Sequence, residues 1–223
     1  MTALLIIDMQ KISFTPETPR FDTKGVVNKI NSLTDQFRKK GESVIFIQHD
    51  GTKDGFCKPN TIEWEILDEI NVDKNDIIVS KIANDSFYQS MLKQILQQEK
   101  IDKLVITGCA TDFCVDSMIK SALTNEYKVT VIADAHTTGD RPHLKAEKVI
   151  EHYNWMWDEM IPINENKIKA FIFKRTNSVH TVLPHNRDIV WRQVGNRLGV
   201  YPVLSFFWIP RMIRIPRINT SQM

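Results

Sequence analysis

Residues Leu104–Val115 read LVITGCATDFCV, and this stretch decides the fold. The β-branched run ends at Gly108, a short polar turn follows, and a helix is expected to begin near Cys114. Such a strand–turn–helix junction places a thiol at the positive end of a helix, which favours the thiolate over a thiol whose ordinary pKa is about 8.5. Cys114 is therefore a candidate nucleophile. The alternative is a packed, unreactive thiol, because free cysteines are among the most buried residue types.

Outward from this junction, apolar strand-like runs alternate with helical patterns. We expect strands at residues 3–9, 43–48, 77–79, 103–107, 128–133 and 168–173, and helices at 24–40, 91–96, 115–122 and 141–157. This alternation is typical of βαβ units, whose right-handed crossovers place helices on both faces of a parallel sheet. The predicted fold class is α/β, a three-layer α/β/α sandwich with a six-stranded, mostly parallel sheet.

Length and composition fit one soluble α/β domain. The chain has 223 residues and a net charge of only +2, which is ordinary for a globular protein with a substantial core. The N-terminus runs directly into an apolar stretch that reaches Asp8, so we expect no signal peptide. The cysteines at 57, 109 and 114 form no CxxC pair, which indicates a reduced, cytoplasmic compartment. We expect neither a nucleic-acid partner nor a membrane partner.

The composition changes after Arg175. No lysine follows Lys174, and residues 176–223 contain six arginines against one acid, Asp188, together with an apolar stretch at 204–210. We therefore divide the chain into a domain at 1–175 and an atypical, poorly ordered tail at 176–223. The tail is interpreted as sequence that never evolved to fold. An arm packed on a neighbouring subunit and a basic patch for a membrane surface are the alternatives.

Three reactive side chains follow three of the expected strands. Asp8 ends the first, Lys81 closes the third, and Cys114 lies just past the fourth. Parallel strands bring these ends to one edge of the sheet, where ligands of open α/β folds bind. Asp8 would take the thiol proton, Lys81 would lower the thiol pKa, and backbone N–H groups of the turn at 109–114 would stabilise an oxyanion. The alternative is a plain Asp8–Lys81 ion pair beside a packed cysteine.

At this point the sequence resembles the isochorismatase-like cysteine hydrolases. The matching blocks are Leu5–Gln10 (LIIDMQ), Lys81 followed by Asp85–Phe87, Gly108–Val115 (GCATDFCV) and Val131–Thr138 (VIADAHTT). The resemblance runs in order from about residue 3 to residue 173. Four ordered blocks are far more specific than any one of them alone.

The resemblance implies a set of site residues. An Asp–Lys–Cys catalytic triad falls on Asp8, Lys81 and Cys114. A non-proline cis peptide falls on Cys109–Ala110, beside an oxyanion hole formed by the N–H groups of Ala110 and Cys114. Family members often assemble, so we expect a homo-oligomer.

The cysteine narrows the reaction that the resemblance implies. Members that carry it are mostly amidohydrolases that pass through a thioester acyl-enzyme. Cys114 therefore favours hydrolysis of a C–N bond in a small amide, urea or carbamate, and not of a peptide bond. One alternative is an isochorismatase-type vinyl-ether hydrolase that uses Asp8 and Lys81. The other is a non-catalytic interaction protein that retains the fold.

The nicotinamidase branch of this family carries an Asp-x-His metal motif. Here the corresponding edge reads His49-Asp50-Gly51, without that motif, so we expect no metal, no cofactor and a substrate other than nicotinamide. Residues 48–51, with Trp64-Glu65 and the segment 134–157, look closer to the streptothricin-hydrolase-like members.

Four residues are candidates for the wall of the substrate pocket. Phe14 and Trp64 lie in expected loops, and Phe87 follows the third strand. His136 follows the fifth strand and could act as an acid or a base. For the aromatic residues the alternative is ordinary packing, and for His136 it is a turn histidine bonded to backbone.

Overall fold

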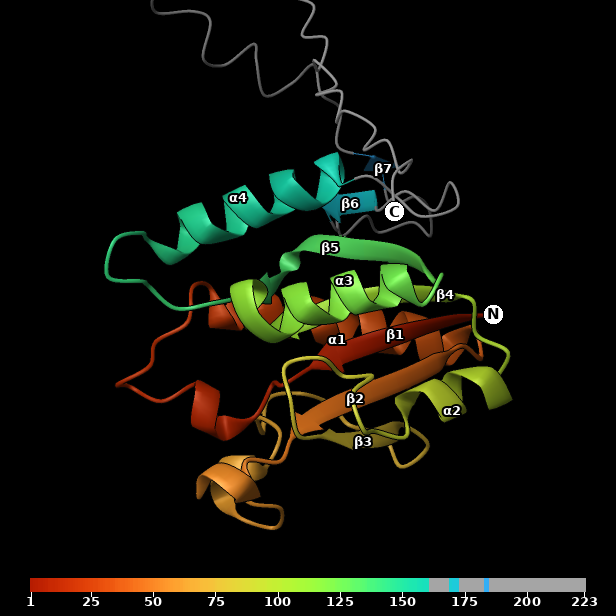
Figure 1. Cartoon of the computed structure of the whole chain (residues 1–223), viewed down its shortest axis with the longest axis horizontal. Coiled ribbons are helices and arrows are strands. Elements are labelled where there is room, and N and C mark those ends of the chain that lie inside the picture. The colour runs from red at the N-terminus through yellow and green to blue at the C-terminus, as the bar shows by residue number, and fades with distance from the viewer. Residues whose placement is uncertain (161–168, 173–182, 185–223) are drawn as a thin grey trace, which may run out of the picture. The chain divides into compact units, whose positions relative to one another are not determined.

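The computed structural model describes residues 1–160, 169–172 and 183–184. Within them, one sheet has the strand order β3-β2-β1-β4-β5-β6-β7 (Figure 1). The strands are β1 (Thr2–Ile7), β2 (Ser43–His49), β3 (Ile77–Lys81), β4 (Lys103–Cys109), β5 (Lys128–Thr137), β6 (Lys169–Ile172) and β7 (Leu183–Pro184). The first six pair in parallel, and β7 runs antiparallel to β6. The predicted six parallel strands are confirmed, and the two-residue β7 is an addition.

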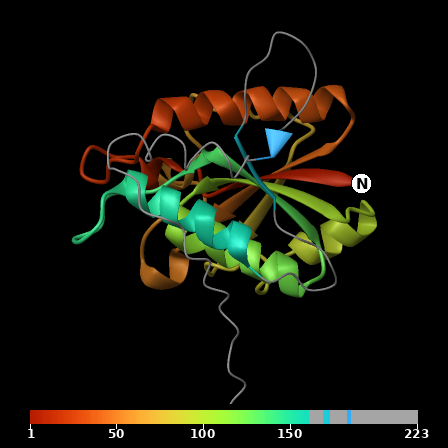
Figure 2. The same cartoon turned by 90° about the horizontal axis from the view of Figure 1, so that it is seen from above.

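Helices cover both faces of the sheet, as predicted (Figure 2). One face is covered by α1 (Thr23–Lys39). The other face is covered by α2 (Leu92–Gln98), α3 (Asp116–Thr124) and α4 (Ala146–Glu159). Alternation along β1 explains the division, because Leu4 and Ile6 pack on the α1 side while Leu5 and Ile7 pack on the opposite side. The result is a three-layer sandwich.

Helix α4 begins later than expected. The pattern predicted a start near Pro142, but the helix begins at Ala146. The Asp140 carboxylate accepts a hydrogen bond from the N–H of Ala146 at 2.9 Å, and the backbone N–H of Arg141 donates to the Leu144 carbonyl at 2.8 Å. Residues 140–145 therefore form a turn that caps the helix from outside, and Pro142 lies in this turn.

The strand order changes direction between β1 and β4. From β1 the chain moves outward to β2 and β3, then returns to the other side of β1 as β4. Ligands of open α/β sheets bind at such a switch point, outside the carboxyl ends of the strands. Gly108 lies opposite Ile7 here, with a φ of 120°, and a Cβ at this position would lie 2.2 Å from the Ile7 carbonyl oxygen. Only glycine allows the two strand ends to approach this closely.

The predicted boundary at residue 175 and the tail at 176–223 lie outside the described residues, apart from the two residues of β7. No helix in the described part of the chain is long and apolar enough to span a membrane.

Candidate active site

Asp8 leaves the end of β1 in an unusual backbone conformation. Its φ of 46° lies in the left-handed region, which is uncommon for a residue with a side chain. Its N–H donates to the Ile47 carbonyl at 2.9 Å, so the strand pairing holds this conformation in place. Conformations of this kind cost about 1–3 kcal/mol and cluster at functional sites. The turn directs a carboxylate into the switch point between β1 and β4.

Lys81 ends β3 and pairs with Asp8. Its Nζ lies 2.8 Å from Asp8 Oδ2 and also donates to the Ala83 carbonyl at 2.9 Å. The side chain is 0% exposed. Burial alone opposes the charged amine, but the negative charges of Asp8 and of Cys114 in its thiolate form outweigh burial and raise the pKa of Lys81. The site therefore contains a buried ammonium–carboxylate pair.

Cys114 lies in a π-helical turn, Thr111–Val115, that precedes α3. Its thiol donates to Oδ1 of Asn84 at 3.6 Å. Burial and the negative charge of Asp8 raise the pKa of the Cys114 thiol to about 12, although the positive charge of Lys81 opposes them. Lys81 acts in the expected direction, because it lowers this pKa, but the expected net fall is wrong, because desolvation of the thiolate is the larger effect. Near neutral pH the sulfur carries its proton.

One oxygen of the Asp8 carboxylate has no hydrogen-bond partner among the described residues. Oδ2 is held by Lys81, whereas Oδ1 is buried and has no hydrogen-bond partner in the part of the chain that the structure describes. A buried acceptor left without a partner is rare and calls for an explanation. The charges of Asp8 and Lys81 both act on the Cys114 thiol, so the structure brings the three predicted side chains together at one edge.

The turn before Cys114 is closed around Ala110. The Cys109–Ala110 peptide bond is cis, the conformation that the resemblance implied. The N–H groups of Phe113 and Val115 both donate to the Ala110 carbonyl, at 3.0 and 3.2 Å.

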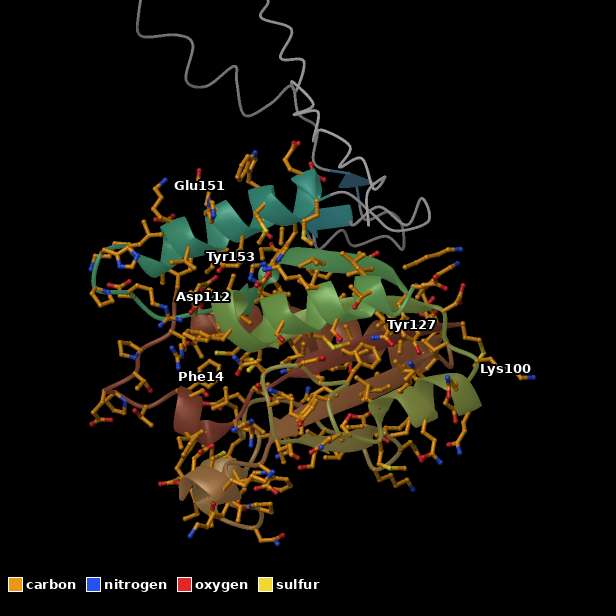
Figure 3. All side chains as sticks on the ribbon, viewed as in Figure 1. Phe14, Lys100, Asp112, Tyr127, Glu151 and Tyr153 are labelled. Atoms are coloured by element: carbon orange, nitrogen blue, oxygen red, sulfur yellow. The ribbon has the colours of Figure 1, made fainter. Side chains whose placement is uncertain are left out.

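Arg141 holds this turn from outside. Its Nε and Nη2 donate to the two carboxylate oxygens of Asp112, both at 2.7 Å, and Thr138 donates to the same carboxylate at 2.7 Å. Figure 3 labels Asp112 near the edge where β1 and β4 end. The paired geometry of the Arg141–Asp112 contact fixes the direction of the turn.

A pocket of about 200 Å³ opens beside Cys114. Its lining residues are Asp8, Gln10, Ile12, Ser13, Arg20, His49, Phe56, Cys57, Asn84, Cys109, Ala110, Phe113 and Cys114. The volume is below the roughly 300–1,000 Å³ of drug-sized ligand sites, which fits a small substrate.

Comparison with known proteins agrees with this arrangement. The isochorismatase domain family matches residues 2–164, well over half of the chain.

This chain belongs to the isochorismatase family.

A streptothricin hydrolase from Streptomyces noursei is 26% identical over 140 residues, which are 63% of this chain but only 56% of that hydrolase. The ureidoacrylate amidohydrolase RutB from Caulobacter vibrioides is 28% identical over 176 residues, covering 62% of this chain and 78% of RutB. The crystal structure of an isochorismatase family protein superposes with a TM-score of 0.69 at 26% identity, covering 76% of this chain and 96% of that one. The predicted family and fold are confirmed, and so is the prediction of a hydrolase at the level of the family.

The predicted pocket aromatics of this isochorismatase-family chain do not line the pocket. Phe14 packs against the core on the α1 side, although Figure 3 shows it near the same edge of the sheet as Asp112. Trp64 contributes its backbone carbonyl, which accepts from Gln10 at 2.9 Å. Phe87 stacks on Tyr127, with ring centres 5.6 Å apart, and packs against the core on the other face. The direction of an aromatic side chain in a loop follows no sequence period, so the pattern did not indicate it.

His136 is a structural residue. Its Nδ1 lies 2.9 Å from Thr111 Oγ1, its Nε2 lies 3.0 Å from Asn154 Oδ1, and its ring meets Trp157 edge-on. Burial lowers the pKa of His136 to about 4, so the ring is neutral near neutral pH. The suggested acid–base role is wrong, because the side chain is buried, fully bonded and outside the pocket.

Nine residues that line the pocket were not predicted as site residues: Gln10, Ile12, Ser13, Arg20, His49, Phe56, Cys57, Asn84 and Phe113. Phe113 and Asn84 could have been found, because the first precedes Cys114 and the second follows β3. Arg20 and Phe56 come from loops that carry no periodic signal.

The His49–Asp50 pair does not form the beginning of a metal site. Burial and the charge of Lys81 lower the pKa of His49, whose ring stacks on Phe56. Asp50 accepts the backbone N–H of Thr52 at 2.9 Å. Across the described residues, no group of three or more His, Cys, Asp or Glu side chains is arranged to hold a metal ion. The expectations of no metal and no cofactor stay predictions.

Proposed function

We propose that this isochorismatase-family chain hydrolyses a C–N bond of a small amide, urea or carbamate through a thioester on Cys114. The observation that carries the proposal is the half-buried Cys114 thiol in the same pocket as a carboxylate, that of Asp8, whose second oxygen has no partner among the described residues. The names of two relatives, streptothricin hydrolase and ureidoacrylate amidohydrolase, support hydrolysis of this kind.

In the acylation step, Asp8 takes the thiol proton as the sulfur of Cys114 attacks the carbonyl carbon. The carbonyl oxygen becomes an oxyanion, stabilised by the N–H groups of Ala110 and Cys114. The tetrahedral intermediate collapses when the C–N bond breaks, and Asp8 returns its proton to the leaving nitrogen. The products of this half are an amine or ammonia and a thioester.

In the deacylation step, a water molecule replaces the amine. Asp8 takes a proton from the water as its oxygen attacks the thioester carbon. The C–S bond then breaks, and the departing sulfur regains the proton from Asp8. The acid product leaves, and the resting thiol is restored.

Lys81 has an electrostatic role in both steps. Its ammonium lies 2.8 Å from Oδ2 of Asp8 and stabilises the negative sulfur as it develops. Lys81 is therefore assigned to positioning and charge balance and not to proton transfer.

The proposal is tested with Cys114→Ala and Cys114→Ser on a panel of small amides, ureas and carbamates. Ammonia release is measured, and acid-quenched wild-type protein is examined by intact mass spectrometry with peptide mapping. We expect an acyl adduct on the peptide that contains Cys114 and a loss of turnover of at least about 1,000-fold in both variants. Turnover retained by Cys114→Ala excludes the thioester mechanism.

The same variants separate the vinyl-ether alternative. Pyruvate release from isochorismate that survives in Cys114→Ala, but not in Asp8→Asn, would assign the chain to that reaction. A wild-type protein that turns over neither class of compound would support the non-catalytic interpretation.

We also propose a homo-oligomer in the cytoplasm that acts on a small molecule, with no nucleic-acid or membrane partner. The family resemblance supports assembly, and the three unpaired cysteines support a reducing compartment. Light scattering on the purified full chain tests the oligomer.

A further inference from the structure

Arg20 is held at the rim of the pocket by its stem and its backbone. Its Nε donates to the Ser13 carbonyl at 2.7 Å. The next residue, Phe21, is tied at both ends, because its N–H donates to the Thr138 carbonyl at 2.9 Å and its carbonyl accepts from Thr137 Oγ1 at 2.6 Å. The backbone next to Arg20 and the Nε end of its side chain are therefore held in place by these hydrogen bonds.

The guanidinium packs over Gly139. A Cβ at Gly139 would lie 2.8 Å from Nη1 of Arg20 and 3.1 Å from the Pro19 carbonyl oxygen. The absence of a side chain at Gly139 therefore allows the guanidinium its present position. Replacing this glycine with alanine would displace the charged group without removing it.

Arg20 differs from the other arginines of the described residues. Arg38 pairs with Asp76, and Arg141 pairs with Asp112. Arg20 has no carboxylate partner within the part of the chain that the structure describes. An arginine kept in a pocket without an acidic partner is a candidate for binding an anionic ligand, because its planar fork of donors matches a carboxylate.

The charges of the pocket wall leave Arg20 unbalanced. Asp8 is the one acidic residue among the lining residues, and Lys81 behind it neutralises it at 2.8 Å. Burial raises the pKa values of the three lining thiols, Cys57 to about 11 and Cys109 and Cys114 to about 12, so these groups are uncharged. The pKa of His49 is lowered by burial, so it is neutral as well.

The charge of Arg20 acts on Cys109, one of the residues that line the pocket. Burial raises the pKa of the Cys109 thiol, and Arg20 is the strongest charged group that opposes this rise. Cys109 begins the cis peptide next to the Cys114 turn. Arg20, Cys109 and Cys114 line the same pocket of about 200 Å³. A substrate bound to Arg20 would therefore lie close to Cys114, the proposed nucleophile.

We infer that the substrate carries an anionic group, in the simplest case a carboxylate, which Arg20 binds while the C–N bond lies at Cys114. The inference rests on the proposed function and adds the charge of the substrate to it. Arg20 is a specificity-determining residue in this assignment, and it takes no part in proton transfer.

The test compares matched pairs of compounds that differ in one charge. Succinamate is paired with butyramide, and N-carbamoylglycine with propylurea. We measure kcat/KM for ammonia release in the wild type, Arg20→Gln, Arg20→Lys and Gly139→Ala. Lys53→Met is the control, because it removes an exposed cation that is not among the pocket-lining residues.

We expect the wild type to prefer the anionic member of each pair. The ratio of anionic to neutral kcat/KM should fall by roughly 10- to 100-fold in Arg20→Gln, since hydrogen bonds to charged groups have effects of this size. The ratio should recover partly in Arg20→Lys, fall in Gly139→Ala, and stay at the wild-type value in Lys53→Met. Equal losses on both members of a pair would contradict the inference.

Binding to Cys114→Ala separates this inference from the proposed function. By calorimetry, this variant should bind succinamate at least about 10-fold more tightly than butyramide, and Arg20→Gln on the same background should remove the difference. Carboxylate binding through Arg20 in Cys114→Ala, combined with no turnover of either compound by the wild type, would contradict the proposed function and support the anion site. Turnover without preference for the anion, or binding of neither compound, overturns the anion site.

Discussion

At the scale of single residues, the site is a balance between burial and charge. Asp8 and Lys81 neutralise each other in a desolvated position, and Cys114 beside them keeps its proton. This differs from sites that store a ready thiolate next to a cation or a helix end. In the proposed mechanism the proton leaves the sulfur during the reaction, and Asp8 receives it.

Breaking the buried pair should be costly for the fold. Asp8→Asn leaves the Lys81 ammonium buried without its carboxylate, and Lys81→Met leaves the carboxylate without its ammonium. Each change should lower the free energy of unfolding by about 3–5 kcal/mol. The loss in the free energy of unfolding of the double variant should be smaller, by at least about 2 kcal/mol, than the sum of the losses of the two single variants.

Urea unfolding of the four proteins measures this coupling. The exposed pair Lys148–Glu151, whose side chains are 62% and 66% exposed, is the control cycle and should show no measurable coupling. Simple additivity of Asp8→Asn and Lys81→Met would show that the pair contributes nothing as a unit.

The alkylation rate of Cys114 should depend steeply on pH. The pKa of its thiol is raised to about 12, above the ordinary value of about 8.5, so the thiolate fraction is small near neutral pH. We expect iodoacetamide to modify Cys114 more slowly than free cysteine, with a rate that rises about tenfold per pH unit and shows no plateau up to about pH 10. Peptide mapping across that range measures the rate, and a plateau near neutral pH would contradict the raised pKa.

The same shift affects stability in a defined direction. The folded-state pKa of Cys114 lies above the unfolded value, so its contribution is complete below about pH 8.5 and is lost as the pH rises towards about 12. Replacing Cys114 with alanine should therefore flatten the alkaline fall in the free energy of unfolding. Slow alkylation of Cys114 is expected whether this thiol is a nucleophile or inert, so the alkylation rate does not distinguish the two. Detection of an acyl group on Cys114 does distinguish them.

At the scale of elements, the contact between β1 and β4 positions the site. Gly108 has a φ of 120°, and an added Cβ would meet the backbone of Ile7. Gly108→Ala should lower the free energy of unfolding by at least about 3 kcal/mol, because it combines backbone strain with a clash against backbone atoms that cannot move aside.

Gly41→Ala is the matched control for Gly108→Ala. Gly41 also has a positive φ, of 67°, but nothing lies within 4 Å of its added Cβ. Its replacement should cost only about 1 kcal/mol. Thermal and urea unfolding compare the two variants, and equal costs would show that the close approach of β1 and β4 is unimportant.

Helices and strands were predictable where the periodic pattern of apolar residues determines them, and the positions of the strand ends were predictable from the parallel topology. The alternating apolar runs predicted the six parallel strands, and parallel topology placed Asp8, Lys81 and Cys114 at one edge. The start of α4 was not predictable in this way, because it depends on the side chain of Asp140 reaching Ala146. The pocket wall was missed for a related reason: whether Phe14 or Phe56 faces the pocket depends on loop packing, and not on periodicity. The direction of the Cys114 pKa likewise depends on how deeply its neighbours bury it.

At the scale of the whole molecule, the candidate site and the last two described strands, β6 and β7, occupy different parts of the sheet. The candidate site is built from the ends of β1, β3 and β4, whereas β6 and β7 extend the sheet beyond β5. The described residues all belong to one compact unit. Strands β6 and β7 are therefore expected to contribute little to the chemistry.

Two truncations test this separation. A chain ending at His185 keeps β7 and should retain wild-type activity and thermal stability. A chain ending at Arg175 loses the two-residue pairing of β7 with β6 and should keep its activity while losing about 1–2 kcal/mol of stability. Loss of activity in both chains would assign the region after residue 185 a part in assembly or in the site.

The protonated state of Cys114 has a consequence for oxidation and inhibition. Peroxide converts thiolates, and not thiols, to sulfenic acid, so the resting enzyme should resist oxidants that inactivate proteins with a standing thiolate. Inhibitor chemistry follows the same rule. An electrophile that needs a free thiolate should react slowly with Cys114, whereas a carbonyl-like group should react faster if Asp8 takes the proton during attack, as the proposed mechanism requires.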